Sequence, residues 1–507
     1  MTTLESQSQG SMGNKIAVDQ FGGIHAVWTK TVWGNRPRYV YYNFRSEIDS
    51  VWVHNPDGTA ISAENGTGYV TLDLFLGGEM IAAYHSADAT PAHSTMAIDA
   101  FRGFGIFTEY SVNSSDENFF PHIARNVLSC RLHMVTTLLE NSFALQYTYS
   151  TDNGVTWSDY ALVDTADLMG YIIVASPVSD KTAILYCKQD STGEFYDVFY
   201  NESMDGIAWD FRFPVNITGF TADDSLSTWS DIDAVYDYND DIHIIYLAAI
   251  VQGGDISLNS TQLRHWYQST GHNVITTGSD SGCAQVADCL CVAKPNLGVD
   301  IDNILFAVWS EMDYNDVSAG GYSNGELYAA YSFDYGIWWS PKVNITNSST
   351  PGCVPLECDC DVWVSLAEKV DGKLHVLYID DKDAGAYGQG IRTINPVMYL
   401  EVDTDILIPV SVNEENAIYP FGFELLRAYP NPFNARATIE FDLAEPGDVD
   451  LTIYDITGAR VEELVDAHMV AGRHSVEWDA TGYGSGTYFA RITTGTRSKT
   501  LKMVLIK

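Results

Sequence analysis

The chain has 507 residues, 46% of them hydrophobic and 12% aromatic, which is enough for two or more folded domains. Its formal net charge of -40 at pH 7 argues against nucleic acid or an anionic membrane as a partner. No apolar run approaches the roughly 18–20 residues of a membrane-spanning helix. The start, "MTTLESQSQGSMGNK", lacks the features of a signal peptide, so we expect that an export signal was removed or that the chain is a fragment.

Residues 16–405 contain a repeat, and the preceding segment, 1–15, is expected to be extended. Each of seven units has a turn, a short strand rich in β-branched or aromatic residues, and in most cases a closing aromatic. The units close at Trp28, Tyr84, Thr136, Tyr186, Tyr246, Trp309 and Tyr378. Four short strands in about 50 residues are typical of a propeller blade. The sequence therefore predicts an all-β fold with a seven-bladed β-propeller, or a six-bladed one if the first and last units share a blade.

Four units carry a histidine three residues before the closing position: His25, His133, His243 and His375. As a functional set they would line a channel or bind a metal. One equivalent position per unit favours a structural role instead. We predict half-buried strand residues that are hydrogen-bonded to a neighbouring blade.

A second repeated element is the motif S-x-D-x-G-x-T-W. One full match and two partial matches occur at the same place in three units. They comprise Ser150, Asp152, Gly154, Thr156 and Trp157; Ser203, Asp205 and Trp209; and Ser332, Asp334, Gly336 and Trp339. In such a turn the Ser and Asp oxygens accept backbone N–H groups, glycine takes a positive φ, and tryptophan packs under the hairpin.

On these residues the chain resembles the sialidase-like Asp-box propellers. The resemblance implies that the boxes are structural and lie away from the ligand face. It also implies that a sialidase would need three arginines for a carboxylate, a Tyr–Glu pair and an acidic Asp in the central cavity. The propeller region offers few arginines, and no triad can be assigned among them, so we do not predict catalytic residues.

Six cysteines form two similar triplets in equivalent loops: Cys283, Cys289 and Cys291, and Cys353, Cys358 and Cys360. Zinc binding is one interpretation, but disulfides are favoured in an exported protein, with pairing inside each loop. Two acidic turns, 237–241 and 380–385, are weak calcium candidates because they lack the rest of a calcium loop. We therefore predict no cofactor and no metal site, and leave calcium open.

After a linker, 406–428, the chain changes character. Residues 429–507 alternate as short strands with Gly-containing turns, which predicts a small Ig-like β-sandwich. This part resembles the C-terminal sorting domain of type IX secretion cargo, which is similar to flagellar hook-capping Ig-like domains. The matching residues include Pro430, Asn431, Pro432, Phe433, Asn434, Gly458, Gly472, Trp478, Gly486, Tyr488 and Lys502. The resemblance implies export to the surface or the medium and a contact with the secretion machinery.

Three functional hypotheses remain open. The first is a monomeric surface protein that binds a glycan or a protein through loops such as 268–290 and 310–324. The second is a sialidase-like glycoside hydrolase or lyase, which requires carboxylates and a basic or tyrosine partner to converge in the axial cavity. The third is a structural surface protein without a small-molecule site.

Overall fold

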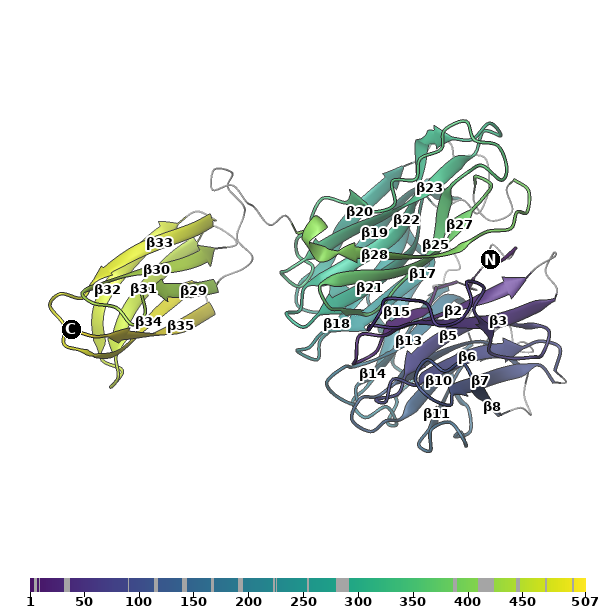
Figure 1. Ribbon diagram of the computed structural model, residues 1–507, viewed down its shortest axis with the longest axis horizontal. Helices are drawn as coiled ribbons and strands as arrows, with labels where there is room; N and C mark the ends of the chain where they lie inside the picture. Colours follow the sequence, from purple (N-terminus) through teal and green to yellow (C-terminus); the bar gives the residue numbers. More distant parts are fainter. Residues whose placement is uncertain are drawn as a thin grey trace. The chain divides into compact units, whose positions relative to one another are not determined.

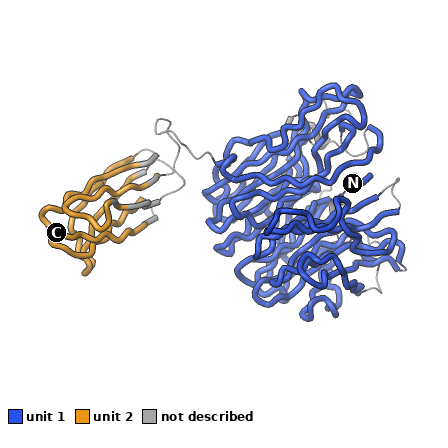
Figure 2. The backbone as a smooth tube through the Cα atoms, in the orientation of Figure 1, with its two compact units in different colours: residues 1–408 blue, residues 409–507 orange. Residues whose placement is uncertain are grey.

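The computed structural model divides the chain into two compact units, Met1–Ile408 and Pro409–Lys507, which are described separately (Figure 2). It describes the whole chain except for a set of short segments. These are 4–6, 9, 32–36, 90, 114–116, 139–143, 166–167, 190–194, 222–223, 225, 253–254, 280–290, 386–389, 409–423, 444–446, 470–471 and 495–496. In the described ranges the regular structure is β-strand apart from the 3-10 helix η3 (Thr404–Ile406), and no helix there could span a membrane.

The first unit is built from successive antiparallel sheets (Figure 1). The first three sheets contain β1 (Ile16–Val18), β2 (Ile24–Thr31), β3 (Arg38–Arg45) and β4 (Thr59–Ala60); β5 (Thr67–Leu74), β6 (Met80–Ser86), β7 (His93–Asp99) and β8 (Phe107–Ser111); and β9 (Asn118–Arg125), β10 (Leu132–Leu138), β11 (Ala144–Ser150) and β12 (Ala161–Asp164). The fourth and fifth contain β13 (Leu168–Ala175), β14 (Thr182–Gln189), β15 (Tyr196–Ser203) and β16 (Val215–Asn216); and β17 (Leu226–Tyr236), β18 (Ile242–Gln252), β19 (Asp255–Tyr267) and β20 (Gly271–Ser279).

Two further sheets complete the first unit. The sixth contains β21 (Val292–Asp300), β22 (Leu305–Val317), β23 (Ser323–Ser332) and β24 (Val343–Asn344), with the parallel strand β26 (Lys369–Val370) added beside β21. The seventh contains β25 (Cys360–Leu366), β27 (Lys373–Asp381) and β28 (Val397–Asp403). The all-β prediction is therefore confirmed. The sheets are antiparallel meanders because apolar and polar residues alternate along a strand, or the strand is apolar throughout, and because the connecting turns are short and rich in Gly, Asp and Asn.

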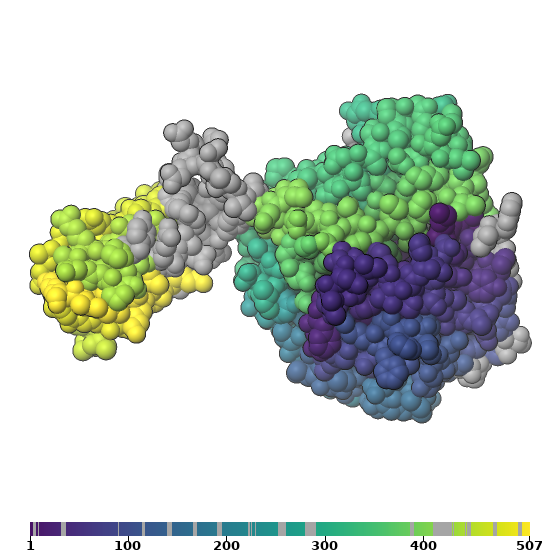
Figure 3. Space-filling model, in the orientation of Figure 1, coloured from purple at the N-terminus to yellow at the C-terminus, as the bar shows by residue number. Residues whose placement is uncertain are grey.

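The sheets close into a propeller-like ring through their apolar faces. Each of seven buried clusters is shared by two successive sheets, and one of them joins the last sheet to the first. That closing cluster contains Ile16 and Ile24 from the first sheet, Leu377 from the seventh, and Ala367 directly after β25. Figure 3 shows the purple N-terminal residues beside the light green residues of the last sheet. The first strands of the sheets, from β1 to β25, contact one another around the axis and are called the inner strands below.

The N-terminal segment crosses the ring on the axis. Its hydrogen bonds reach four sheets: Gln7 Nε2 to Thr29 O (3.1 Å), Ser11 Oγ to Ser230 O (3.1 Å), Leu72 N to Asn14 O (2.8 Å) and Lys15 N to Ser365 Oγ (3.2 Å). These bonds connect the first, second, fifth and seventh sheets, and we therefore call the N-terminal segment the axial tie.

Six inner strands, from the second sheet to the seventh, contain a register irregularity. In four of them a long side chain sits there with positive φ, which L-residues of this size rarely adopt. These residues are Tyr69 (55°), Phe120 (56°), Lys294 (50°) and Trp363 (56°), named here the bulge collar. A β-bulge bends its strand and redirects a side chain.

The second unit has two sheets around one core. One contains β29 (Glu424–Tyr429), β30 (Arg436–Leu443) and β33 (Gly472–Asp479); the other contains β31 (Gly447–Asp455), β32 (Arg460–Met469), β34 (Gly486–Thr494) and β35 (Arg497–Leu505). Phe433, Trp478 and Ile492 are among the fully packed residues between them. Strand β29 lies in the segment expected to be a linker and pairs with β30, so this sheet begins before residue 429.

Candidate functional site at the axis of the ring

The three S-x-D turns are hairpins between the third and fourth strands of their sheets. In the first, Ser150 Oγ donates to Asp152 Oδ1 (2.8 Å) and accepts the N–H of Gly154 (2.8 Å). Asp152 Oδ1 accepts the N–H of Thr156 (2.9 Å), and Trp157 Nε1 donates to Gly154 O (3.1 Å). Every polar group named in the motif is thus used inside the turn.

The two partial motifs form the same turn. Ser203 Oγ donates to Asp205 Oδ1 (3.1 Å), and Trp209 Nε1 donates to Gly206 O (3.3 Å). In the third turn Ser332 Oγ donates to Asp334 Oδ1 (2.9 Å) and accepts the N–H of Gly336 (2.9 Å), while Trp339 is buried. Trp338, which replaces the threonine, donates only its backbone N–H to Asp334 (2.9 Å).

The repeated histidines are fully buried and bond within their own sheets, so the expectation of half-burial and of a bond to a neighbouring blade was wrong. His133 Nδ1 meets the Tyr147 hydroxyl (2.7 Å) and Nε2 meets Asn126 Oδ1 (2.5 Å). The equivalent partners are Tyr42 and Asp19 for His25, His265 and Asp237 for His243, and Tyr399 and Asp371 for His375. The partners lie in the turn before the strand and on the strand after it, so the sheet itself bonds both ring nitrogens of His25, His133 and His375. His243 bonds His265, and its Nε2 lies 3.6 Å from Asp237 Oδ2, beyond hydrogen-bond distance.

The two repeated elements meet between sheets. Tyr147 of the third sheet donates its hydroxyl to the carbonyl of Gly206 in the fourth sheet's hairpin (2.6 Å). A Cβ on Gly206 would lie 2.5 Å from His133 Cε1, and one on Gly336 would lie 2.0 Å from His265 Nδ1. Each of these hairpins therefore packs on the buried polar group of the preceding sheet. Sequence reasoning found both motifs but missed this contact, because nothing in their spacing encodes it.

The described arginines of the first unit have partners in different places. They include Arg38 with His85, Arg45 with Glu401, Arg102 with Asp19 and Glu47, Arg125 with Leu74 O and Asn126 O, Arg131 with Asp205 O, and Arg212 with Asp210. These contacts are structural ties of loops and strand ends, not a shared binding site for one carboxylate.

A cavity of about 240 Å³ lies on the axis, where the inner strands end. Six sheets contribute strand residues to its wall, the turn between β25 and β26 contributes Glu368, and the axial tie contributes Asn14. Its charged and phenolic residues are Asp19, Asp73, Arg125, Tyr236, Tyr238, Glu368 and Lys369. The carboxylates and their basic or tyrosine neighbours required by the enzyme hypothesis are thus present in the axial cavity.

Two of these carboxyl groups, one on β5 and one in the turn after β25, are shifted towards their neutral forms. Burial raises the pKa of Glu368 to about 7, opposed by a hydrogen bond from Asn14 (2.7 Å) and reinforced by Asp73. Burial also raises the pKa of Asp73, opposed by Arg125. Asp19 differs: burial would raise its pKa, but hydrogen bonds from His25 and Arg102 lower it below the ordinary value. The cavity therefore combines acids that differ in protonation at neutral pH.

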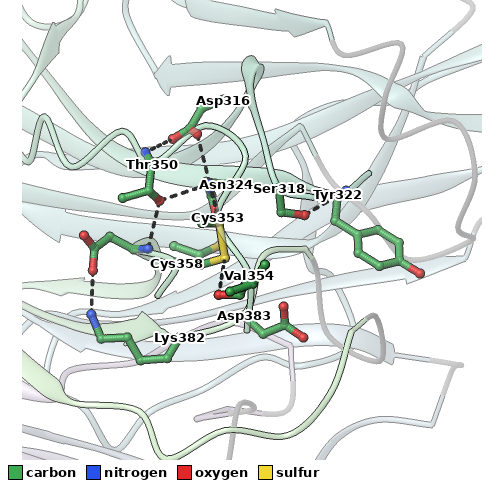
Figure 4. The surroundings of a disulfide bond; sticks show 12 residues. Asp316, Ser318, Tyr322, Asn324, Thr350, Cys353, Val354, Cys358, Lys382 and Asp383 are labelled. Carbon is green, nitrogen blue, oxygen red and sulfur yellow. Dashed lines mark hydrogen bonds and ion pairs between the residues drawn. A yellow bond between two sulfur atoms is a disulfide. The ribbon is translucent and has the colours of Figure 1, made fainter. Parts of the chain in front are cut away.

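The cysteine triplet of the seventh unit contains a disulfide between Cys353 and Cys358, within one loop as expected (Figure 4). Asn324 Nδ2 donates to Asp316 Oδ1 (3.0 Å) and lies 3.6 Å from Cys353 Sγ. These contacts dock the loop on the adjoining ends of β22 and β23. Cys360 is a buried thiol. Of the other triplet, Cys283 and Cys289 lie outside the described residues, and Cys291 is buried.

In the two acidic turns, carboxylates bond to residues of the same turn. Asp237 Oδ1 accepts the N–H groups of Asn239 and Asp241 (2.9 Å each), and Asp380 pairs with Lys382 (2.5 Å). Within the described ranges no group of three or more His, Cys, Asp or Glu side chains is placed to hold a metal ion.

In the second unit the residues near 431 and the last strand form one structure. Asn431 Nδ2 donates to Lys502 O (2.9 Å), and Asn431 Oδ1 accepts the N–H of Val504 (2.9 Å). Phe433 pairs with the same strand, through its N–H to Val504 O and its carbonyl to the N–H of Ile506 (2.9 Å each), while its ring lies 5.4 Å from that of Trp478.

The remaining residues singled out in this unit lie in turns and strand ends. Pro430, Pro432 and Asn434 are exposed around Asn431; Gly458 (φ 83°) closes the turn between β31 and β32; Gly472 and Gly486 begin β33 and β34; and the Tyr488 hydroxyl donates to Gly484 O (2.8 Å).

Comparison with known proteins adds one firm assignment. Residues 427–507 match the family model described as a secretion system C-terminal sorting domain. This domain implies that the chain is exported, to the medium or the outer surface, and that it engages a secretion machinery. No curated protein matches the chain.

Solved structures resemble the chain only distantly. An ulvan lyase of polysaccharide lyase family PL25 has 11% identity and a TM-score of 0.48 over 79% of this chain and 96% of its own. PorZ, a surface component of the type IX secretion system of Porphyromonas gingivalis, has 13% identity and a TM-score of 0.40 over 99% and 61%. The Hadza microbial sialidase Hz136 has 10% identity and a TM-score of 0.40 over 73% and 74%. At these values the similarities carry no functional inference.

Proposed function

We propose that this chain is an exported surface or extracellular protein whose seven-bladed β-propeller, a ring with three Asp-box hairpins, binds a glycan or protein ligand at the axial cavity. The second unit, an Ig-like sandwich by this proposal, is the address read by the type IX machinery. The observation that carries the binding proposal is the cavity itself, since six sheets and the turn after β25 contribute to one polar, charged depression on the axis.

The cavity volume limits the ligand. About 240 Å³ is below the roughly 300–1,000 Å³ of sites that enclose a drug-sized molecule, so the cavity receives an end group such as one sugar residue or one side chain. Its carboxyl and carboxylate oxygens accept hydrogen bonds from hydroxyl or ammonium groups, while Arg125 and Lys369 donate.

A glycan array and a pulldown with the exported chain test the binding proposal. Glu368→Gln and Asp73→Asn should each lower the affinity for the captured ligand by about tenfold, because each replaces one acceptor oxygen of the cavity by an amide NH2 group. Empty results from both screens, or variants that bind like the parent chain, contradict it. Deleting residues 409–507 should abolish export, and unchanged export contradicts the sorting role.

A glycoside hydrolase or lyase is the second candidate, favoured by the coupled pair Asp73 and Glu368. Glu368, whose pKa burial raises to about 7, interacts with the second carboxyl group of Asp73, and a raised pKa of this kind is typical of a general acid near a second carboxyl group. Release of reducing ends, or of unsaturated products, from a panel of polysaccharides would reveal such an activity. Glu368→Gln should then abolish turnover while the ligand still binds; turnover that survives this substitution excludes the assignment.

A further inference from the structure

The bulge collar lies at the end of the inner strands opposite the axial cavity. The cavity is lined by the last residues of these strands, for example Leu74, Ala175 and Tyr236. The collar residues Tyr69 and Phe120 stand instead at the beginnings of β5 and β9. The collar and the cavity are therefore two different places on the axis.

Collar side chains come together in pairs. The rings of Tyr69 and Phe120, on neighbouring sheets, are 5.2 Å apart with their planes nearly perpendicular. Lys294 Nζ lies 4.7 Å from the ring centre of Trp363, on the sixth and seventh sheets. All four residues are partly exposed. Three of the four residues are aromatic, so an unfavourable backbone conformation is used repeatedly to hold a partly exposed ring at this end of the inner strands.

A buried polar group against the collar lacks a partner. His85 contacts both rings, at 5.4 Å from Tyr69 and 5.1 Å from Phe120, and is 1% exposed. Its Nε2 accepts an N–H from Arg38 (2.8 Å), so Nδ1 carries the hydrogen of the neutral ring. Among the described residues nothing accepts that hydrogen. Buried donors are normally satisfied, by protein, by water or by a ligand.

The charges decide which ring-stacking ligand fits. Aromatic faces stack nucleobases or the apolar C–H faces of sugars, but a chain of net charge -40 repels nucleic acid. The collar's own cation, Lys294, is already paired with Asp231 (2.7 Å). An uncharged ligand with flat apolar faces and hydroxyl groups matches these features.

We propose that the bulge collar binds a neutral oligosaccharide, at a site separate from the axial cavity. Sugar rings stack on Tyr69, Phe120 and Trp363, and a sugar hydroxyl, directly or through a water molecule, accepts the Nδ1 hydrogen of His85. The site does not depend on the proposed function of the cavity, because no collar residue lines it.

The test uses glycine because it adopts positive φ without strain. Calorimetric titration of the full chain with cellohexaose, xylohexaose and mannohexaose should give saturable binding of at least one. Tyr69→Gly and Trp363→Gly should each weaken it at least tenfold while the melting temperature stays within a few degrees or rises. Tyr335→Gly is the matched control, since Tyr335 is also an aromatic residue with positive φ (61°) but belongs to the third hairpin; its binding should stay unchanged.

Four results would overturn the proposal. One is the absence of binding by the parent chain to all three hexasaccharides. Another is an equal loss in Tyr69→Gly and Tyr335→Gly. A third is a Tyr69→Gly variant that loses stability and keeps its affinity, which would make the collar a folding element. The last is binding of an acidic oligosaccharide, titrated as a fourth ligand beside the three neutral ones, that is stronger than theirs and is removed by salt.

Discussion

The contact between Gly206 and His133 allows a direct test of how successive sheets are joined. Gly206→Ala forces a side chain into positive φ, +65°, and places Cβ 2.5 Å from His133 Cε1. The conformational strain costs about 1–2 kcal/mol and the overpacking about 1–3 kcal/mol. His133→Ala costs about 3 kcal/mol, because it removes the imidazole and leaves Asn126 and the Tyr147 hydroxyl with fewer partners.

The double variant separates the two effects. Without the imidazole the new methyl group has room, so the double variant should cost about 1–3 kcal/mol less than the sum of the single ones. Chemical denaturation followed by tryptophan fluorescence measures the four free energies of unfolding. Gly154→Ala is the control, since its Cβ would meet Met96 and not His133. Coupling below about 0.5 kcal/mol for Gly206, or equal coupling for Gly154, would refute the proposed packing.

The same histidine makes a pH prediction. Burial, helped by Arg131, lowers the pKa of His133 to about 3 from an ordinary 6.5. Between these values the unfolded chain binds a proton that the folded sheet excludes, so the stabilisation present above pH 6.5 is lost progressively as the pH falls. A chain with His133→Ala should lose stability less steeply than the parent between pH 6.5 and 4. Parallel melting curves across that range would contradict the burial argument.

Three further substitutions probe the cavity, the axial tie and the sorting unit. Glu368→Gln should stabilise the first unit by up to about 3 kcal/mol above pH 7 and by nothing below pH 4.5, because the carboxyl pKa rises from 4.5 to about 7 on folding; a thermal shift series across pH detects this. Asn14→Ala should lower the first unit's unfolding free energy by about 1–2 kcal/mol, since it removes a bond to a buried carboxyl; denaturation that is unchanged contradicts it. Asn431→Ala should lower the free energy of unfolding of the second unit by about 2 kcal/mol, because two hydrogen bonds are lost, and should leave the first unit unchanged; calorimetry that resolves the two transitions measures this.

The parts of the structure that the sequence predicted are those set by neighbours along the chain. Turn chemistry identified the hairpins at Ser150 and Ser332, and the loop shared by Cys353 and Cys358 indicated their pairing. The repeated histidines were recognised as structural, but their partners were assigned to the wrong sheet. Periodicity alone does not show whether the nearest acceptor of His133 lies in its own sheet or in the next.

The candidate site was beyond reach for the same reason. Asp73 on β5 and Glu368 in the turn after β25 are far apart in the chain, and only closure of the ring brings them to one cavity. The polar segment before residue 16 has no apolar pattern, so its passage through the ring left no signal in the sequence. The bulges at Tyr69 and Trp363 were likewise hidden, because an extra residue in a strand looks like an ordinary change of alternation.

By itself, the sequence determined the all-β class and the sorting address. Both depend on short-range patterns, alternation within strands, turn residues between them, and the motif residues of 427–507. The tertiary structure alone decided which polar groups meet at the axis, which hairpin covers which histidine, and which strained rings stand at the collar. The physical reason is that these contacts join residues of different sheets. The angle and distance between successive sheets in the closed ring set which residues meet, and a small change in either would bring different residues together.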